Sequence, residues 1–287
     1  MQLSANAAAK LNFCLGVTGR TDNGYHLIES VMQSVGLFDT VTVKTNHSGK
    51  ITVKTNVDLL NNQNNTAYLS AEKYFSAFGI SDGVDICIEK RIPSAAGLGG
   101  GSADAAAVLT LLDKIYGKCS VKQLEKIALS VGADVPFCLS GGTAAVRGIG
   151  EKIEKLPDFP DCFLVLVKNG KKSSTKDMYN AVDKLGFSGV GCTEKVENSI
   201  KNSNLKLICQ NLFNDFYKVC KTADSENILK VLKENGAIGT GLSGAGPTLF
   251  GIFENMSNAE KAREQLILSA NYVFVVKPTK QSFFIVD

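Results

Sequence analysis

Residues 93–103 read Pro93-Ser94-Ala95-Ala96-Gly97-Leu98-Gly99-Gly100-Gly101-Ser102-Ala103, and they connect a predicted strand to a predicted helix. Apolar and polar residues alternate over 84–89, which indicates a strand, and residues 103–116 carry apolar side chains at helical spacing. Glycines leave backbone N–H groups uncovered, and the first turn of a helix attracts negative charge. The stretch is therefore predicted to bind an anion, with phosphate as the natural ligand.

Other interpretations of the glycine-rich sequences are less favoured. A flexible connector is less favoured, because linkers do not usually lie between a clear strand and a clear helix. The stretch is not a Walker A loop, since the chain contains no Gly-x-x-x-x-Gly-Lys-[Ser/Thr]. Residues 239–244 match Gly-x-Gly-x-x-Gly, but a strand-like segment follows where a dinucleotide site needs a helix. Residues 239–246 are predicted to pack closely against a ligand or against 93–103, with a plain tight turn as an equal alternative.

The remaining sequence predicts an α+β fold, because strands and helices follow one another without regular alternation. Pro157 and Pro160 precede a new apolar run, so two domains are predicted, 1–158 and 159–287. Residues 27–35 fit either spacing and are assigned as strand. The predicted strands are 11–17, 27–35, 41–43, 51–53, 84–88, 144–156, 163–167, 249–253 and 272–276. The predicted helices are 66–78, 103–116, 120–132, 177–185, 205–221, 226–234 and 259–270.

Composition narrows the class of protein. Of 287 residues, 44% are hydrophobic and 21% charged, and no apolar run is long enough to span a membrane, so we expect a soluble protein without a membrane partner. The amino terminus shows no basic run followed by an apolar core, so the cytoplasm is the expected location. The net charge of +3 is too small to indicate a nucleic-acid surface, so a small-molecule partner is expected. The sequence carries no signal for an oligomeric state.

Cysteine and histidine offer little raw material for metal or redox chemistry. The eight cysteines form no Cys-x-x-Cys pair, and each is expected to be a small buried thiol. With two histidines, His26 and His47, the chain is not expected to build a histidine metal cluster or a histidine-based triad.

Asp134 and Lys10 each have a structural and a functional interpretation. Asp134 follows a predicted helix end and precedes Pro136 by two positions, so it fits a helix N-cap or a general base. Lys10 lies on the polar face of a predicted strand and would ordinarily be a solvated surface lysine. Taken singly, the structural interpretation is favoured for both residues.

Taken together and in order, these motifs resemble the GHMP kinase superfamily, over nearly the whole chain. The resemblance is strongest to the branch that phosphorylates a cytidylyl sugar alcohol. It implies a GHMP kinase fold, with an N-terminal unit like the second domain of ribosomal protein S5, a C-terminal ferredoxin-like unit and an active site between them. The residues that carry it are Lys10-Leu11-Asn12, Thr18-Gly19-Arg20, Gly24-Tyr25-His26, 93–103, Gly132-Ala133-Asp134-Val135-Pro136 and 241–246.

The resemblance implies ATP, as its Mg²⁺ complex, as phosphoryl donor and the 2-hydroxyl of 4-diphosphocytidyl-2-C-methyl-D-erythritol, an isoprenoid precursor of the non-mevalonate route, as acceptor. In that pattern Asp134 takes the hydroxyl proton and Lys10 holds the carboxylate and the developing charge. The resemblance assigns no acidic metal ligand. Ser102 would contact either Mg²⁺ or a phosphate group. Asp104 is interpreted as favourable negative charge in the first turn of the helix rather than as a metal ligand. The residues implied to bind ATP are Pro93, Ser94, Ala95, Ala96, Gly97, Leu98, Gly99, Gly100, Gly101, Ser102 and Ala103.

Further residues are implied to bind the acceptor. His26 would read the edge of the cytosine base, Tyr25 would stack on it, and Asn12 would lie nearby. Thr175 and Tyr179 follow from a looser match at 170–179. Asn65 and Thr66 precede a predicted helix, so they fit an adenine border or a helix cap equally well.

Two competing functions are carried forward. A sister GHMP kinase, acting on homoserine or mevalonate, is the closer alternative, and Tyr25 and His26 argue against it. A nucleotide-binding regulator without catalysis is the other, and the presence of both Lys10 and Asp134 argues against that.

Overall fold

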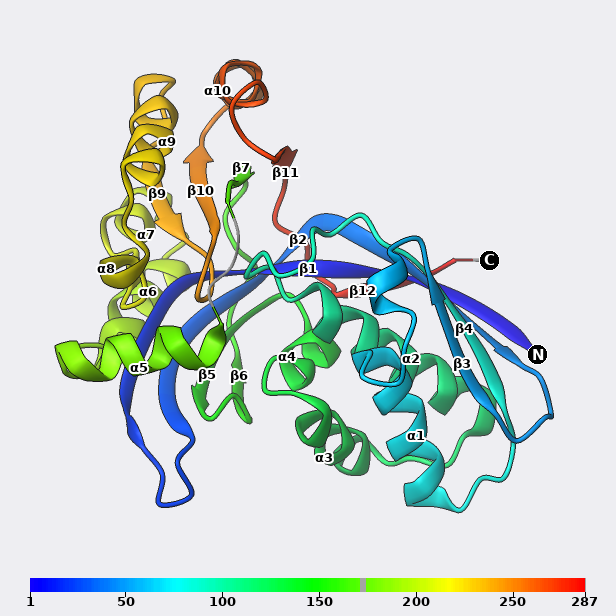
Figure 1. The fold of residues 1–287 in the computed structure, drawn as a ribbon. Coiled ribbons are helices and arrows are strands. Elements are labelled where there is room, and N and C mark those ends of the chain that lie inside the picture. Colours follow the sequence, from blue (N-terminus) through cyan, green and yellow to red (C-terminus); the bar gives the residue numbers. More distant parts are fainter. Residues whose placement is uncertain (171–173, 287) are drawn as a thin grey trace.

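The computed structural model describes residues 1–170 and 174–286, and two β-sheets organise them (Figure 1). The strands are β1 (Gln2–Arg20), β2 (His26–Thr45), β3 (Ile51–Thr55), β4 (Val84–Glu89), β5 (Thr143–Gly148), β6 (Lys152–Lys155), β7 (Phe163–Lys168), β8 (Phe213–Asn214), β9 (Gly239–Leu242), β10 (Thr248–Phe253), β11 (Tyr272–Val276) and β12 (Phe283–Val286). The helices are α1 (Thr66–Phe78), α2 (Gly100–Tyr116), α3 (Val121–Val131), α4 (Val135–Ser140), α5 (Thr175–Leu185), α6 (Cys192–Lys201), α7 (Leu205–Gln210), α8 (Tyr217–Cys220), α9 (Ala223–Glu234) and α10 (Met256–Leu266), with a 3-10 turn η1 (Asp58–Leu60).

The larger sheet is built on the long antiparallel pair β1 and β2, which runs through the molecule in blue in Figure 1. Its order is β12-β1-β2-β4-β3, and β5 and β6 extend it from β2. Helices α1 and α2 cover one face of this sheet, and their alanine- and leucine-rich sides form a common core with the buried residues of β2 and β4. The predicted strand at 27–35 is confirmed as part of β2.

The smaller sheet is antiparallel, in the order β11-β7-β10-β9. Helices separate β7 from β9 and β10 from β11, so the chain follows a β-α-β-β-α-β course. This is the ferredoxin-like arrangement that the resemblance implied for the C-terminal part of the chain. The last strand, β12, leaves this sheet and pairs with β1. The division after residue 158 stays a prediction.

Two predicted elements are wrong. Residues 205–221 form not one helix but α7, the short strand β8 and α8, because Phe213 and Asn214 pair with Cys14 and Leu15 of β1. Residues 144–156 form a hairpin of β5 and β6 rather than one strand. Four further elements, α4, α6, β9 and β12, are not predicted from the sequence. Each missed element is short or depends on a partner that is distant in the chain.

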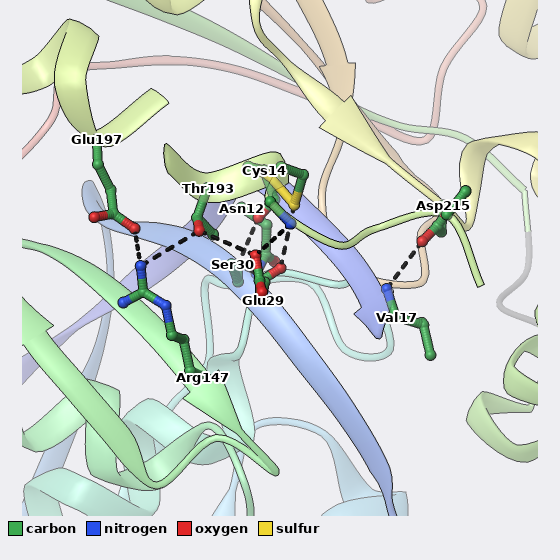
Figure 2. The surroundings of a disulfide bond; sticks show 12 residues. Asn12, Cys14, Val17, Glu29, Ser30, Arg147, Thr193, Glu197 and Asp215 are labelled. Atoms are coloured by element: carbon green, nitrogen blue, oxygen red, sulfur yellow. Dashed lines mark hydrogen bonds and ion pairs between the residues drawn. A yellow bond between two sulfur atoms is a disulfide. The ribbon is translucent and has the colours of Figure 1, made fainter. Parts of the chain in front are cut away.

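The cysteine prediction is also wrong in part (Figure 2). Cys14 of β1 and Cys192 of α6 form a disulfide across 178 positions of sequence, with Cα atoms 6.5 Å apart. Cys87 is free but exposed, because it lies on the outward side of β4. Polar contacts flank the disulfide: Thr193 donates to a Glu29 carboxylate oxygen at 3.2 Å. Figure 2 shows both residues beside the disulfide. Helix α6 is therefore fastened to the β1–β2 pair by covalent and polar contacts.

Within the described residues, none of the helices has both the length and the apolar character needed to cross a membrane.

A segment distant in the sequence packs closely onto β1 at Gly16. A Cβ atom there would lie 2.4 Å from the Cα atom of Gly189, whereas one at Gly19 would meet only a Leu27 methyl group at 3.8 Å. Gly16→Ala should lower the free energy of unfolding by about 2 kcal/mol, because the backbone cannot move away easily. Gly19→Ala is the matched control. Denaturant unfolding measures both, and equal stability of the two variants would contradict the close approach.

Candidate active site

A cavity of about 560 Å³ opens between the glycine-rich loop, β1 and α5. Residues from distant parts of the chain line it, which is expected of a site assembled by the fold rather than by one segment. Most of the residues predicted from the sequence lie on its wall. Those residues are Lys10, Asn12, Pro93 to Ser102, Asp134, Thr175 and Tyr179.

The glycine-rich loop lies on β1 and leads into α2. The Lys10 N–H donates to the Leu98 carbonyl oxygen at 2.9 Å, and a Cβ atom on Gly99 would approach the Lys10 side chain to 2.8 Å. Gly97 and Gly99 have positive φ angles of 79° and 69°, which favour glycine. The loop can therefore run close to Lys10 and present the N-terminus of the 17-residue helix α2 to the cavity.

The second glycine-rich segment, 239–246, packs against this loop. The Ser243 hydroxyl donates to the Gly97 carbonyl oxygen at 3.0 Å, and a Cβ atom on Gly97 would lie 2.3 Å from the Ser243 carbonyl oxygen. Of the alternatives left open by the sequence, packing against 93–103 is confirmed. The two segments together form one wall of the cavity, which Gly244 and Ala245 also line.

Lys10 and Asp134 meet beside the loop. Their Nζ and Oδ2 atoms are 3.2 Å apart, and the Lys10 side chain is 5% exposed, so the surface-lysine interpretation is wrong. Asp134 occupies the N-cap position of α4, but its side chain makes no capping hydrogen bond, so the capping interpretation fails as well. The carboxylate is a third exposed and faces the cavity with the ammonium group.

Asn12 organises the Lys10 side of the cavity. Its Oδ1 atom accepts from Lys10 Nζ at 2.8 Å and from the Gly244 N–H at 3.0 Å. Its Nδ2 atom donates to the Ser30 hydroxyl at 2.9 Å, and that hydroxyl donates to the Cys14 carbonyl oxygen beside the disulfide (Figure 2). Asn12 therefore holds the lysine and the second glycine-rich segment in place together.

A buried ion cluster that sequence reasoning missed lies under the loop. Lys90 Nζ donates to Asp104 Oδ2 at 2.5 Å and to an Asp39 carboxylate oxygen. The other Asp39 oxygen accepts from the N–H groups of Arg91 and Ile92 at 2.6 and 2.8 Å. The Lys90 ammonium group and the carboxylates of Asp39 and Asp104 therefore join the segment that leads into the loop to the first turns of α2.

This cluster corrects the interpretation of Asp104. The residue is not first-turn charge, since its side chain is 3% exposed and paired with Lys90. Burial raises the pKa of the Asp104 carboxyl to about 7, although the Lys90 ammonium opposes that rise. Burial by itself would lower the pKa of Lys90, but Asp104 and Asp39 reverse this and raise it. No local sequence signal joins Asp39 to the loop, because the two are brought together by β2.

The structure divides the predicted acceptor-binding residues: Asn12, Thr175 and Tyr179 line the cavity, whereas Tyr25 and His26 are not among its lining residues. Thr175 and Tyr179 lie on α5, while Tyr25 is 60% exposed on the β1–β2 turn. His26 is half-buried and stacks on Tyr179 with 4.2 Å between ring centroids. Residues 171–173 of the looser motif lie outside the described part of the chain.

Asn65 and Thr66 both line the cavity, and Asn65 also caps a helix. Asn65 Oδ1 accepts from the Ala67 N–H at 2.9 Å at the start of α1. The Thr66 hydroxyl donates to the Gly101 carbonyl oxygen at 2.7 Å and so ties α1 to the first turn of α2. The capping interpretation is confirmed for Asn65, and an adenine contact stays a prediction.

Comparison with known proteins places these features in a family context. Residues 65–142 match the GHMP kinases N terminal domain, and residues 197–272 match GHMP kinases C terminal. A 4-diphosphocytidyl-2-C-methyl-D-erythritol kinase of Clostridium tetani is 38% identical over 96% of this chain and 99% of its own length. The enzyme of the same name from Clostridium botulinum strain Loch Maree is 39% identical over 95% of this chain and 99% of its own length.

Solved structures of kinases resemble this chain in fold. A crystal structure of 4-(cytidine 5'-diphospho)-2C-methyl-D-erythritol kinase has a TM-score of 0.78 at 28% identity, covering 96% of this chain and 98% of its own. A homoserine kinase from Cytophaga hutchinsonii has a TM-score of 0.80 at 19% identity, over 99% of this chain and 97% of its own. The second similarity is one of fold alone.

The geometry predicts different effects at neighbouring glycines of the loop. A side chain at Gly101 would face the cavity and meet only the Thr66 hydroxyl at 3.2 Å, whereas one at Gly100 would meet Ile92 at 2.9 Å. Gly101→Val should weaken ATP binding roughly tenfold at unchanged thermal stability, because it covers N–H groups at the helix start. Gly100→Val should instead lower the melting temperature. Calorimetric titration measures the first effect, and unchanged ATP affinity in folded Gly101→Val would restore the connector interpretation.

Proposed function

Because the chain belongs to the GHMP kinases and, among them, to the 4-diphosphocytidyl-2-C-methyl-D-erythritol kinases, we propose that Lys10 and Asp134 carry out its phosphoryl transfer. The enzyme is an ATP-dependent small-molecule kinase of the methylerythritol phosphate route to isoprenoid precursors. Its proposed acceptor atom is the 2-hydroxyl of 4-diphosphocytidyl-2-C-methyl-D-erythritol. The observation that supports the proposal most directly is the 3.2 Å contact between Lys10 and Asp134 beside an anion-binding loop.

Phosphoryl transfer requires mainly positioning and charge stabilisation. In the proposed reaction Asp134 accepts the proton of the acceptor hydroxyl, whose oxygen attacks the γ-phosphorus of ATP. The bond from this phosphorus to the β,γ-bridging oxygen breaks, and ADP leaves. The Lys10 ammonium holds the carboxylate and stabilises negative charge that develops on the transferred group. The N–H groups at the start of α2 bind the phosphates. Asn12, already bonded to Lys10, keeps the ammonium group at this position.

Magnesium is proposed as the partner of ATP, and the side chains around the loop are compatible with it. Ser102 is half-buried at the start of α2 and lines the cavity, so its hydroxyl can join phosphate oxygens around the ion. Asp104 is already paired with Lys90, and within residues 1–170 and 174–286 no three acidic, histidine or cysteine side chains form a metal cluster. These residues fit an ion that arrives with the nucleotide, and bound there it would neutralise phosphate charge.

The acceptor end of the cavity is proposed to bind the cytidine group, with Tyr25 and Tyr179 as stacking surfaces, His26 at the base edge and Thr175 at the rim. The half-buried Tyr179 ring beside His26 supports this assignment. We further propose that residues 1–158 and 159–287 form the two domains and that the reaction takes place in the cytoplasm.

A sister kinase acting on homoserine or mevalonate remains the second candidate, favoured only by shared fold. Turnover of 4-diphosphocytidyl-2-C-methyl-D-erythritol, homoserine and mevalonate with ATP separates the candidates. Phosphorylation of mevalonate or homoserine without phosphorylation of the cytidylyl compound would overturn the proposed function.

The catalytic pair gives the first test of the proposed function. Asp134→Asn keeps the side-chain shape but removes the proton acceptor, so turnover should fall by roughly 10² to 10⁴ while the Kd of ATP changes little. Lys10→Ala should reduce turnover to a similar extent. Asp177→Asn, on α5 and bonded to Ser174, is the control carboxylate. Near wild-type turnover in Asp134→Asn would remove Asp134 from the reaction.

Base recognition gives the second test. His26→Ala should leave polar groups of the bound cytosine without partners and weaken transition-state binding by about 1 to 3 kcal/mol. The preference for the cytidylyl substrate over its uridylyl analogue should fall as well. Specificity constants for both compounds measure this, with His47→Ala as control because His47 is exposed and pairs with Asp82. An unchanged preference in His26→Ala would place base recognition elsewhere.

A further inference from the structure

We propose that Asp183 is a positioning residue that fixes the tautomer of His26, with the proton on Nε2, so that Nδ1 is an acceptor for the 4-amino group of the substrate's cytosine. The inference rests on the proposed function, which places His26 at the base edge. Asp183 would thus contribute to cytosine recognition by orienting His26, without contacting the base itself.

Helix α5 presents two groups to His26. Tyr179 and Asp183 are four positions apart and therefore lie on one face of the helix. The Tyr179 ring stacks on the imidazole, and Asp183 Oδ1 lies 2.9 Å from His26 Nε2. The imidazole side chain is 11% exposed and the carboxylate 22% exposed. One helix face thus fixes both the plane of the ring and the partner of one ring nitrogen.

The short contact determines where the proton lies. A carboxylate oxygen only accepts hydrogen bonds, so an unprotonated Nε2 at 2.9 Å would set two lone pairs against each other. A hydrogen on Nε2 removes this repulsion, because Nε2 then donates to Asp183. In the neutral imidazole this leaves Nδ1 unprotonated. Within the described residues, Nδ1 of His26 has no hydrogen-bond partner from the protein.

Arg20 would favour the other tautomer, with an unprotonated Nε2, but it does not enforce that tautomer. Its Nε atom lies 3.0 Å from His26 Nε2 and could donate only to an unprotonated nitrogen. Its Nη2 atom, however, pairs with Asp183 Oδ2 at 2.5 Å, and its side chain is 46% exposed. Arg20 is the more exposed partner, so its Nε–H group can turn toward water while Nη2 keeps the pair with Asp183, whereas that pair holds Oδ1 of the less exposed Asp183 against Nε2. The carboxylate therefore decides the tautomer, and Arg20 holds the carboxylate.

The tautomer has a direct consequence for base selection. Cytosine carries a 4-amino donor where uracil-type bases carry a 4-oxygen acceptor. An unprotonated Nδ1 accepts a hydrogen bond from the amino group but would repel the lone pairs of the 4-oxygen. It therefore favours binding of the cytidylyl substrate and disfavours binding of its uridylyl analogue. Asp183 is thereby expected to affect base preference without contacting the base.

The first experiment observes the tautomer itself. Since the chain has two histidines, His47→Gln leaves His26 as the single imidazole. Nitrogen-15 NMR of this protein at a pH where imidazole is neutral should show a protonated Nε2 and an unprotonated Nδ1. In Asp183→Asn both tautomers should be populated, because an amide can turn either its oxygen or its NH₂ group toward Nε2. A protonated Nδ1 in the parent, or the same single tautomer in Asp183→Asn, would overturn the inference.

The second experiment measures specificity in the full-length enzyme. Asp183→Asn preserves size, so a merely space-filling role predicts no change, whereas tautomer control predicts a roughly tenfold lower preference for the cytidylyl over the uridylyl substrate, mainly through KM. Asp177→Asn, on the same helix, is the matched control. If His26→Ala lowers the preference and Asp183→Asn does not, the inference fails alone. If neither lowers it, the proposed base-reading role of His26 fails with it.

Discussion

The hydrogen bond from the Lys10 N–H to the Leu98 carbonyl oxygen is the contact on which the site depends. It fixes the glycine-rich loop on β1 at the residue whose ammonium group pairs with Asp134, so anion binding and proton acceptance share one backbone position. The side chain of Asn12 extends the same control to Gly244. Lys10 can be buried there because its charge has both a carboxylate and an amide oxygen as partners.

The parts that sequence reasoning predicted correctly are local ones. The alternation of β4, the glycine-rich loop and the periodicity of α2 follow each other within about 30 residues, a range in which spacing and turn chemistry determine structure. The predicted helix at 120–132 is local in the same way, since Ser120 and Gln123 form a capping box at the start of α3. Lys10 and Asp134 were different, because each looked structural when considered singly. Only the order of motifs along the chain joined them.

The parts that were missed depend on contacts between distant segments. Asp39 meets Lys90 because β2 carries it there, and neither residue has a neighbour in sequence that marks it. Cys14 and Cys192 are separated by most of the chain. The segment 205–221 has helical spacing, but pairing of β8 with β1 satisfies backbone groups that a continuous helix would have used otherwise. Tertiary pairing therefore overrides local propensity in each case.

The site also separates chemistry from recognition. Lys10, the loop and Asp134 lie on β1, α2 and the start of α4, which the ion cluster of Lys90 and the packing of 239–246 hold together. The proposed base-reading group instead joins the β1–β2 turn to α5, through the stacking of His26 on Tyr179 and the pairing of Asp183 with Arg20. Because different elements carry the two groups, base preference can change through α5 while the geometry of phosphoryl transfer is kept. The long β1 strand links the two, since it contributes Lys10 to the first group and ends at Arg20 in the second.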